Sequence, residues 1–149
     1  MPRVQAIVVR RDRALMVKHR HNGVEWWVLP GGAQEDDELP WQGALREFKE
    51  ECNVDGVVVR PTAWASAVDG VQSYSFLVDI GDQNPSLGLD PEVAEGKQVP
   101  VLVDVQWLRL ADIPERDRAF LWAAGLLSVD EFLLEVENWG DDPSYPSHA

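Results

Sequence analysis

Glu47, Glu50 and Glu51 stand close together in the stretch ALREFKEECNV, residues 44 to 54. Positions three and four apart are neighbours on a helix surface, so a helix here places the three carboxylates on one face. Like charges at this spacing destabilise a solvated helix, and a bound cation reverses the effect. An all-oxygen ligand set favours Mg²⁺ or Mn²⁺ over zinc. The cluster therefore predicts a divalent metal site, with a solvated acidic helix face as the alternative.

A site of this kind is suited to phosphate chemistry. Mg²⁺ usually takes one or two carboxylates, keeps several waters and shares oxygens of substrate phosphates, which suits a cleft better than a closed cage. The chain carries 26 acidic and 13 basic residues, a net charge of -13. This balance argues against contact with a nucleic-acid duplex or an anionic membrane. A small anionic substrate can still approach as its metal complex.

The helix that positions the glutamates is expected to begin at Pro40, whose fixed φ suits a first helical position. Apolar residues recur at helical spacing opposite the acids and predict an amphipathic helix of about three turns. They are Trp41, Ala44, Leu45, Phe48 and Cys52. Cys52 is the single cysteine of the chain, which excludes an internal disulfide and a cysteine zinc cluster. Its place on the apolar stripe favours a small core residue over a nucleophile.

The rest of the chain alternates strand signals with loops. Runs rich in β-formers predict strands at 4–9, 14–19, 24–29, 54–68, 73–80 and 101–110. Polar residues 33–39 predict a loop, and the glycines and prolines of 81–100 predict a longer one. Helical periodicity returns at 116–127 and 128–139, before a tail at 141–149 that we expect to fray. The pattern predicts one α+β domain over residues 1–140.

The acidic stretch belongs to a longer pattern. Residues 32–54, GAQEDDELPWQGALREFKEECNV, resemble the Nudix box GX5EX7REUXEEXGU, in which U is a bulky apolar residue, and every charged position matches. The preceding WWVLPGG is also similar to the usual approach to the box. Asn53 replaces the last glycine, and asparagine is the next best residue for the left-handed turn expected there. Leu39 stands where many members have a Ser or Thr cap, a loss of about 1 kcal/mol.

The resemblance to the Nudix hydrolase family implies a fold and an activity. The implied fold is an α/β/α sandwich with a mixed β-sheet. The implied activity is metal-dependent hydrolysis of a pyrophosphate linkage in a nucleoside diphosphate joined to another group, by attack of water at phosphorus. Substrates of the (deoxy)nucleoside triphosphate, sugar-nucleotide and dinucleotide classes stay open. The alternative is a catalytically inactive Nudix-like module that binds a nucleotide.

Roles carry over to the matching positions of this sequence. The resemblance assigns Mg²⁺ or Mn²⁺ to Glu47, Glu50, Glu51 and the carbonyl oxygen of Gly31. Glu47 is also a candidate base. Arg46 is expected to brace the glutamates within the catalytic group, and its position four residues before Glu50 allows a helix ion pair. Glu38 and Gly32 are expected to support the site.

Contacts with substrate are less sharply indicated. Trp26 and Trp27 are consecutive in a predicted strand and point to opposite faces, so one could line a substrate cleft while the other packs; core packing for both is the alternative. Arg20 could meet a phosphate or could be a solvated hairpin arginine. Glu92 and Glu95, in the later loop, are candidates for a further ligand or base.

Location and partners follow from absences in the sequence. No apolar run approaches the roughly 20 residues that span a bilayer, and the N-terminus lacks the apolar core of a signal peptide. We therefore expect a cytoplasmic protein whose partner is a small phosphorylated metabolite or nucleotide, without contact to membrane or nucleic-acid duplex. A homodimer is left open by the family resemblance. His19, His21 and His148 show no ligand-like spacing and carry no inference.

Overall fold

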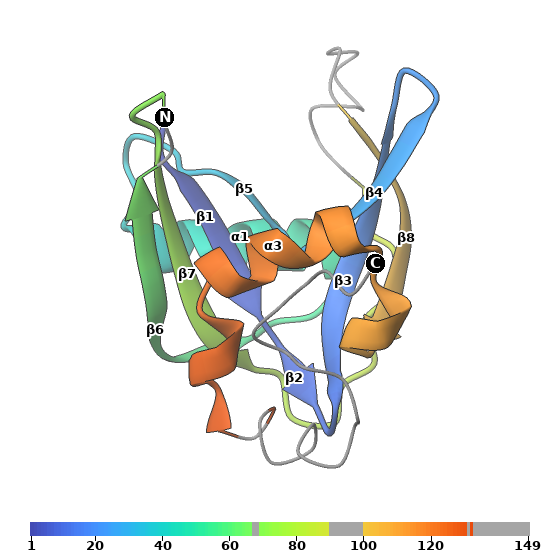
Figure 1. Cartoon of the computed structure of the whole chain (residues 1–149). Coiled ribbons are helices and arrows are strands. Elements are labelled where there is room, and N and C mark those ends of the chain that lie inside the picture. The colour runs from blue at the N-terminus through green and yellow to red at the C-terminus, as the bar shows by residue number, and fades with distance from the viewer. Residues whose placement is uncertain (67–68, 90–99, 131, 133–149) are drawn as a thin grey trace.

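Two β-sheets form the centre of the computed structural model, which describes residues 1–66, 69–89, 100–130 and 132 (Figure 1). The first sheet has the order β5 (Gly31–Ala33), β1 (Arg3–Ile7), β7 (Gln72–Asp79) and β6 (Val57–Ser66). The second has the order β2 (Val9–Arg10), β3 (Arg13–His21) and β4 (Val24–Val28), with β8 (Val101–Leu108) paired to β3. Strands β1 and β7 run parallel, whereas the other pairs are antiparallel. The fold is therefore α+β with mixed strand directions.

Two α-helices cover opposite faces of these sheets, α1 (Pro40–Cys52) behind and α3 (Glu115–Ala123) in front in the view of Figure 1. Short 3-10 turns, η1 (Leu110–Asp112) and η2 (Leu126–Ser128), flank α3. None of the helices within the described ranges is long and apolar enough to cross a membrane. The α/β/α sandwich expected from the sequence is confirmed.

Alternation along the strands feeds a separate hydrophobic core on each side. In β3, Leu15 and Val17 pack into the core that contains Phe48 of α1. The intervening Met16 packs into the core that contains Leu121 of α3. Since successive strand residues point to opposite faces, β3 contributes side chains to the core under each helix.

The apolar stripe of α1 is buried along most of its length. Ala44, Phe48 and Cys52 are fully buried, as the stripe predicts. Trp41, the first residue of the stripe, is 43% exposed, so the prediction is wrong there. Burial raises the pKa of the Cys52 thiol, in agreement with its predicted role as a core residue. The helix therefore presents its opposite face, with the acids, to strand β5 and the loops around it.

Both ends of α1 have identifiable stops. At the start, the side-chain oxygen of Gln42 accepts a hydrogen bond from the Leu39 N–H at 2.8 Å, which offsets part of the missing Ser or Thr cap. At the end, Asn53 has the left-handed conformation that the sequence predicted, with φ of 61°. Its N–H donates to the carbonyl oxygen of Lys49 at 2.9 Å and closes the last turn.

Strand β5 was not predicted from the sequence, and its last residue, Ala33, falls within the loop expected at residues 33–39. Gly31, Gly32 and Ala33 pair antiparallel with β1 and extend its sheet. Glycine has low strand propensity, so the sequence gives no local signal for this strand. An added Cβ on Gly31 would lie 2.1 Å from the carbonyl oxygen of Val4, and only glycine therefore allows this close pairing.

The predicted helix over 116–127 is shorter in the structure. Helix α3 ends at Ala123 because Gly125 adopts a left-handed φ of 85°, after which η2 follows. The predicted helix over 128–139 and the predicted tail fall almost entirely outside the described residues. The predicted strand over 4–9 is divided into β1 and β2.

Candidate active site

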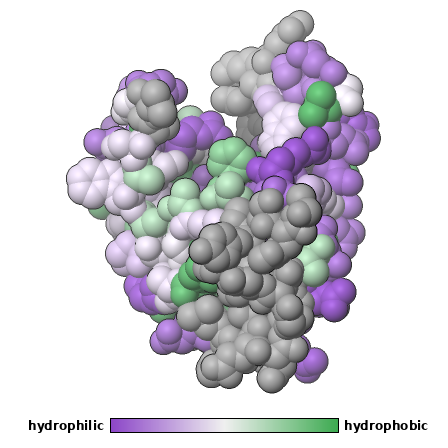
Figure 2. All heavy atoms as spheres, in the orientation of Figure 1, coloured by the Kyte–Doolittle hydropathy of each residue, from purple (hydrophilic) through white to green (hydrophobic). Residues whose placement is uncertain are grey.

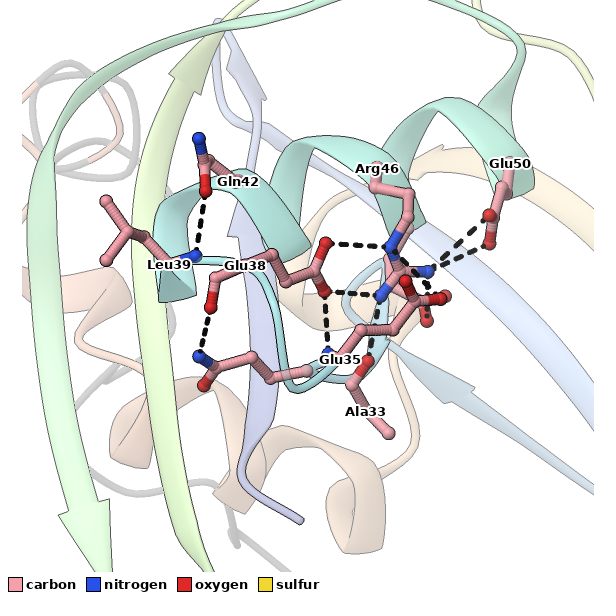
Figure 3. Close-up of polar contacts among 9 residues, drawn as sticks. Ala33, Glu35, Glu38, Leu39, Gln42, Arg46 and Glu50 are labelled. Carbon is pink, nitrogen blue, oxygen red and sulfur yellow. Dashed lines mark hydrogen bonds and ion pairs between the residues drawn. The ribbon is translucent and has the colours of Figure 1, made fainter.

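The guanidinium of Arg46 is the centre of the polar contacts on α1 (Figure 3). It faces the carboxylates of Glu35, Glu38, Glu47 and Glu50. Nε and Nη2 donate to the two oxygens of Glu38 at 3.0 and 2.7 Å, and Nη2 also donates to the carbonyl oxygen of Ala33 at 2.9 Å. This two-pronged geometry fixes the plane of the guanidinium and supports the bracing role predicted for Arg46.

Glu38 is held in turn by the loop before α1. Its Oε1 accepts the Glu35 N–H at 2.8 Å, and an added Cβ on Gly43 would lie 2.7 Å from the same oxygen. The hydrogen bond from Arg46 is the main cause that lowers the pKa of Glu38. The same hydrogen bond raises the pKa of Arg46. The pair is therefore a charged, packed brace beneath the remaining glutamates.

The surroundings of Glu47 disfavour the ionised form of its carboxyl group. Burial, followed by the charge of Glu51, raises the pKa of Glu47 to about 7, even though Arg46 Nη1 donates to its Oε1 at 3.0 Å. A Cβ on Gly32 would lie 2.5 Å from the Glu47 carboxyl carbon. Because Gly32 has no side chain, the Glu47 carboxylate can lie directly against β5, which is a physical reason for the support role predicted for Gly32.

Glu51 also lies against β5 and is only 4% exposed. Its Oε1 accepts the Gly31 N–H at 2.7 Å, and its Oε2 lies 3.5 Å from Nε2 of His19. The sequence analysis missed His19. Alternation from Leu15 and Val17 places it on the α1 face of β3, which is a signal that could have found it.

Glu50 meets Arg46 as the spacing predicted. Nη1 of Arg46 lies 3.3 Å from its Oε2 in an i,i+4 ion pair, and this expectation is confirmed. Glu50 is more exposed than Glu47 or Glu51, since 29% of its side chain is accessible, against 18% and 5%. It is therefore the acid of the three most open to a group arriving from solvent.

The loop after β7 lies against the C-terminal end of α1. The N–H groups of Ser86 and Gly88 donate to the carbonyl oxygens of Cys52 and Glu51 at 2.9 and 2.8 Å. A Cβ on Gly88 would lie 1.8 Å from the Glu50 carbonyl oxygen, so the backbones meet directly. The candidates Glu92 and Glu95 lie outside the described residues.

The donor set fits a hard divalent cation, although its side chains are engaged within the protein. No group of three His, Cys, Asp or Glu side chains within the described ranges is gathered as a ready cation site. Glu47 and Glu50 face Arg46, whereas Glu51 faces β5. The three acids nevertheless offer only carboxylate oxygens, two of them share the Arg46 guanidinium, and Glu47 is a buried member with a raised pKa. Metal binding at the predicted residues stays a prediction.

Trp26 and Trp27 lie on opposite faces of β4, as the alternation along a strand predicts. Trp27 packs into the α3-side core, with the Lys18 ammonium 4.7 Å from the centre of its ring. Trp26 lies on the other face, with its ring edge-on to His19 at 5.9 Å between centroids. Arg20 donates from Nε to Glu25 at 2.7 Å, so it is an ion-paired hairpin residue here.

A cavity of about 510 Å³ lies between β4, β1 and α3, and we call it the β4–α3 cavity. Its lining includes Gln5, Trp26, Val28, Arg116, Asp117 and Phe120. Figure 2 shows apolar atoms at the centre of this face, between more polar surfaces on either side. Gln5 of β1 is paired with Gly31 of β5, and the Gly31 N–H donates to Glu51. The cavity wall is therefore continuous with the strand that binds Glu51. The sequence analysis missed Asp117 and Phe120, because no local pattern tells which face of α3 meets β4.

With this geometry in view, the chain was compared with known proteins. The family model described as "NUDIX domain" matches residues 1–128. A "Nucleoside triphosphate pyrophosphatase/Nudix hydrolase fusion protein" of Bifidobacterium longum is 27% identical over 90 residues, which are 60% of this chain and 17% of that protein. The chain thus spans about a sixth of the length of this curated relative.

Solved structures agree on the fold. A NUDIX hydrolase from Nitrosomonas europaea superposes with a TM-score of 0.64 at 22% identity, covering 93% of this chain and 72% of that one. A UDP-X diphosphatase gives 0.61 at 20% identity, covering 88% and 66%. An ADP-ribose pyrophosphatase from Streptococcus suis gives 0.59 at 19% identity, covering 94% and 92%. At these identities the likeness concerns the fold.

Proposed function

Since the matching family model spans residues 1–128, the chain belongs to the NUDIX family, and we propose that it is a metal-dependent pyrophosphohydrolase. Its substrate would be a nucleoside diphosphate linked to another group, and its cofactor Mg²⁺ or Mn²⁺. The observation that carries the proposal is the Glu47 carboxyl, buried beside Glu51 and sharing its one guanidinium partner with three other carboxylates. A buried acid cluster short of positive charge suits a cation-dependent reaction.

We assign the metal to Glu47, Glu50 and Glu51, with the carbonyl oxygen of Gly31 beside them. When bound there, a divalent ion would neutralise charge on phosphoryl oxygens and make a bound water more acidic. Arg46, anchored to Glu38 and to the Ala33 carbonyl oxygen, keeps Glu47 and Glu50 oriented. Glu47 is the candidate base, because a pKa near neutrality suits proton transfer at that pH.

The candidates outside the acid cluster differ in support. Trp26 lines the β4–α3 cavity and is a plausible stacking surface for substrate, whereas Trp27 is a core residue. Arg20 would have to leave Glu25 to reach a phosphate. Glu92 and Glu95 follow Gly88, whose N–H is bound to the Glu51 carbonyl, so we keep one of them as a further ligand or base.

The similar structures suggest which linkage to test. One is named a UDP-X diphosphatase and another an ADP-ribose pyrophosphatase. Both names describe a diphosphate bridge, which fits an acid cluster beside a cavity large enough for the organic part of such a molecule. Sugar nucleotides are therefore the first of the three candidate classes to test, before nucleoside triphosphates and dinucleotides.

A binding module without turnover is the second candidate. It is favoured by one observation, namely that Arg46 already pairs with Glu47 and Glu50 and that the acids in the described part of the chain form no ready cation cluster. In such a protein Arg46 would act as the permanent counter-ion. Nucleotide would then bind without being cleaved.

The experiment that tests hydrolysis is release of phosphate, pyrophosphate and nucleoside monophosphate from a nucleotide panel, with Mg²⁺, with Mn²⁺ and with chelator. We expect metal-dependent turnover in the wild type. In Glu50→Gln the turnover rate should fall on the order of 100-fold, because even residues that only support metal ligands change activity by about 10- to 100-fold. Glu115→Gln, an exposed change of equal charge on α3, is the matched control and should keep full activity. Turnover that needs no metal, or that survives in Glu50→Gln, contradicts the proposal.

A further inference from the structure

We propose that the β4–α3 cavity holds the nucleobase of the substrate and that Asp117 selects guanine. This inference rests on the proposed function for the position of the phosphates. It goes further in naming the base and the residue that reads it.

The cavity offers two aromatic surfaces from different elements. On β4, Trp26 shares a face with Val24 and Val28, and on α3 the position of Phe120, four residues after Arg116, places it on the same side as that arginine. Phe120 is 64% exposed, which is a large apolar surface left uncovered at the rim. A flat, mainly apolar ligand such as a nucleobase matches these walls through stacking.

Beside Gln5 and Arg116, the cavity is lined by one buried carboxylate. Asp117 is only 3% exposed, and its Oδ2 accepts the Trp27 N–H at 3.0 Å. Oδ1 lies 3.6 Å from Nε of Arg116, beyond a good hydrogen bond. A carboxylate has about four lone-pair sites, so acceptor capacity remains for a ligand in the cavity. The hydrogen bond to Trp27 meanwhile fixes the orientation of the carboxylate against β4.

An acceptor-only group distinguishes among the bases. Guanine presents two adjacent donors, N1–H and the 2-amino group, which a carboxylate can accept together. Adenine and cytosine set one donor beside an acceptor nitrogen, and uracil sets its N–H between two carbonyl oxygens. In each of these a second carboxylate oxygen would face a lone pair. Guanine is therefore the best match, and hypoxanthine, which lacks the 2-amino group, keeps one of the two bonds.

The cavity also adjoins the acids at two points. Gln5 in its wall is paired with Gly31, whose N–H binds Glu51. Trp26 meets the ring of His19, and His19 lies 3.5 Å from Glu51. The Gln5–Gly31 pair and the Trp26–His19–Glu51 contacts thus connect the cavity wall with the proposed phosphate position, as the two halves of one nucleotide require.

The test measures binding and turnover separately. Calorimetry with GDP, IDP, ADP and UDP, in chelator and then with Mg²⁺, gives the base preference without catalysis. We expect GDP to bind on the order of tenfold or more tightly than UDP, with IDP between them, as for a paired donor edge. In Asp117→Asn the amide oxygen can keep the bond to Trp27 while the NH₂ faces the cavity, so the preference should vanish. Asp112→Asn, an exposed change of equal charge, should retain it.

A second variant guards against a folding defect in Asp117→Asn. Phe120→Ala, at an exposed side chain, should weaken every nucleotide several-fold and leave the order of the bases unchanged. Equal binding of all four diphosphates, or a preference for GDP that survives in Asp117→Asn, overturns the inference. Guanine preference without metal-dependent hydrolysis supports the base site and contradicts the proposed hydrolase activity. Metal-dependent hydrolysis without base preference supports the hydrolase activity and contradicts the base site.

Discussion

The backbone N–H of Gly31 donates to Oε1 of Glu51 at 2.7 Å and joins the site helix to the edge strand β5. The next residue, Gly32, supports the carboxylate of Glu47 from the same strand. Two adjacent glycines therefore position two acids that lie one helical turn apart. Because neither glycine has a side chain, the backbone of β5 lies directly against the two carboxylates of α1.

The two glycines should respond differently to alanine. In Gly31→Ala the new Cβ would lie 2.1 Å from the Val4 carbonyl oxygen, so strand β1 must move, and we expect a loss of about 3 kcal/mol or more in unfolding free energy. In Gly32→Ala the Cβ meets the end of the Glu47 side chain, which can turn away. That variant should stay folded within about 1 kcal/mol of the wild type and lose metal-dependent turnover. Urea unfolding and activity assays give both values, and equal destabilisation of the two variants contradicts the assignment.

The raised pKa of Glu47 predicts how stability depends on pH in the metal-free protein. Its folded-state pKa of about 7 exceeds the ordinary value of 4.5, so the folded protein binds more protons than the unfolded chain. The stabilisation is complete below pH 4.5 and is lost as pH rises through about 7. It corresponds to on the order of 2 to 3 kcal/mol.

The measurement compares wild type with Glu47→Gln by thermal melting in chelator from pH 5 to 8. The wild type should lose stability relative to the variant as pH rises, because glutamine does not titrate. Glu115→Gln serves as the matched control and should follow the wild type. Parallel curves for wild type and Glu47→Gln would show that Glu47 titrates normally.

Lysine should not replace Arg46. The guanidinium donates to both oxygens of Glu38 and to the Ala33 carbonyl oxygen, and a single ammonium cannot reproduce this fork. We expect Arg46→Lys to lower the unfolding free energy by about 2 kcal/mol and to reduce turnover. Arg13→Lys, at a half-exposed arginine 3.9 Å from Asp12, is the control and should change neither quantity. If urea unfolding gives Arg46→Lys the stability of the wild type, a positive charge alone, without the guanidinium fork, is sufficient to brace Glu38.

Asn53 should tolerate glycine better than alanine. Its φ of 61° costs a residue with a Cβ about 1 kcal/mol, and its side chain donates to Ser86 and Leu87 at 3.1 Å. Asn53→Gly relieves the first effect and loses the second, so it should stay close to the wild type. Asn53→Ala retains the backbone penalty and should be less stable than Asn53→Gly by about 1 kcal/mol. Urea unfolding measures the unfolding free energy of both variants. Equal values for Asn53→Gly and Asn53→Ala would show that the left-handed backbone costs nothing at this position.

The parts of the site that depend on local sequence were the ones that could be predicted. Burial of most of the α1 stripe, the left-handed Asn53 and the ion pair of Arg46 with Glu50 depend on residues within one or two helical turns, and each is confirmed. The two-sided sandwich was implied by the family resemblance, and the two hydrophobic cores agree with it.

The parts that were missed depend on contacts between distant segments. Strand β5 forms because β1 lies beside a pair of glycines, and no propensity marks such residues as a strand. His19 reaches Glu51 through the position of α1 against β3, and Asp117 reaches Trp27 across most of the chain. Helix α3 stops early at Gly125, where a left-handed backbone overrides the apolar periodicity.

The anchoring of Ser86 and Gly88 on the last carbonyl oxygens of α1 has a consequence for protein engineering. These backbone bonds hold the loop after β7 against the last turn of α1, and Gly88 must be kept there because the two backbones meet directly. A segment exchanged after Leu89 would therefore begin from a fixed point and leave the acids in place.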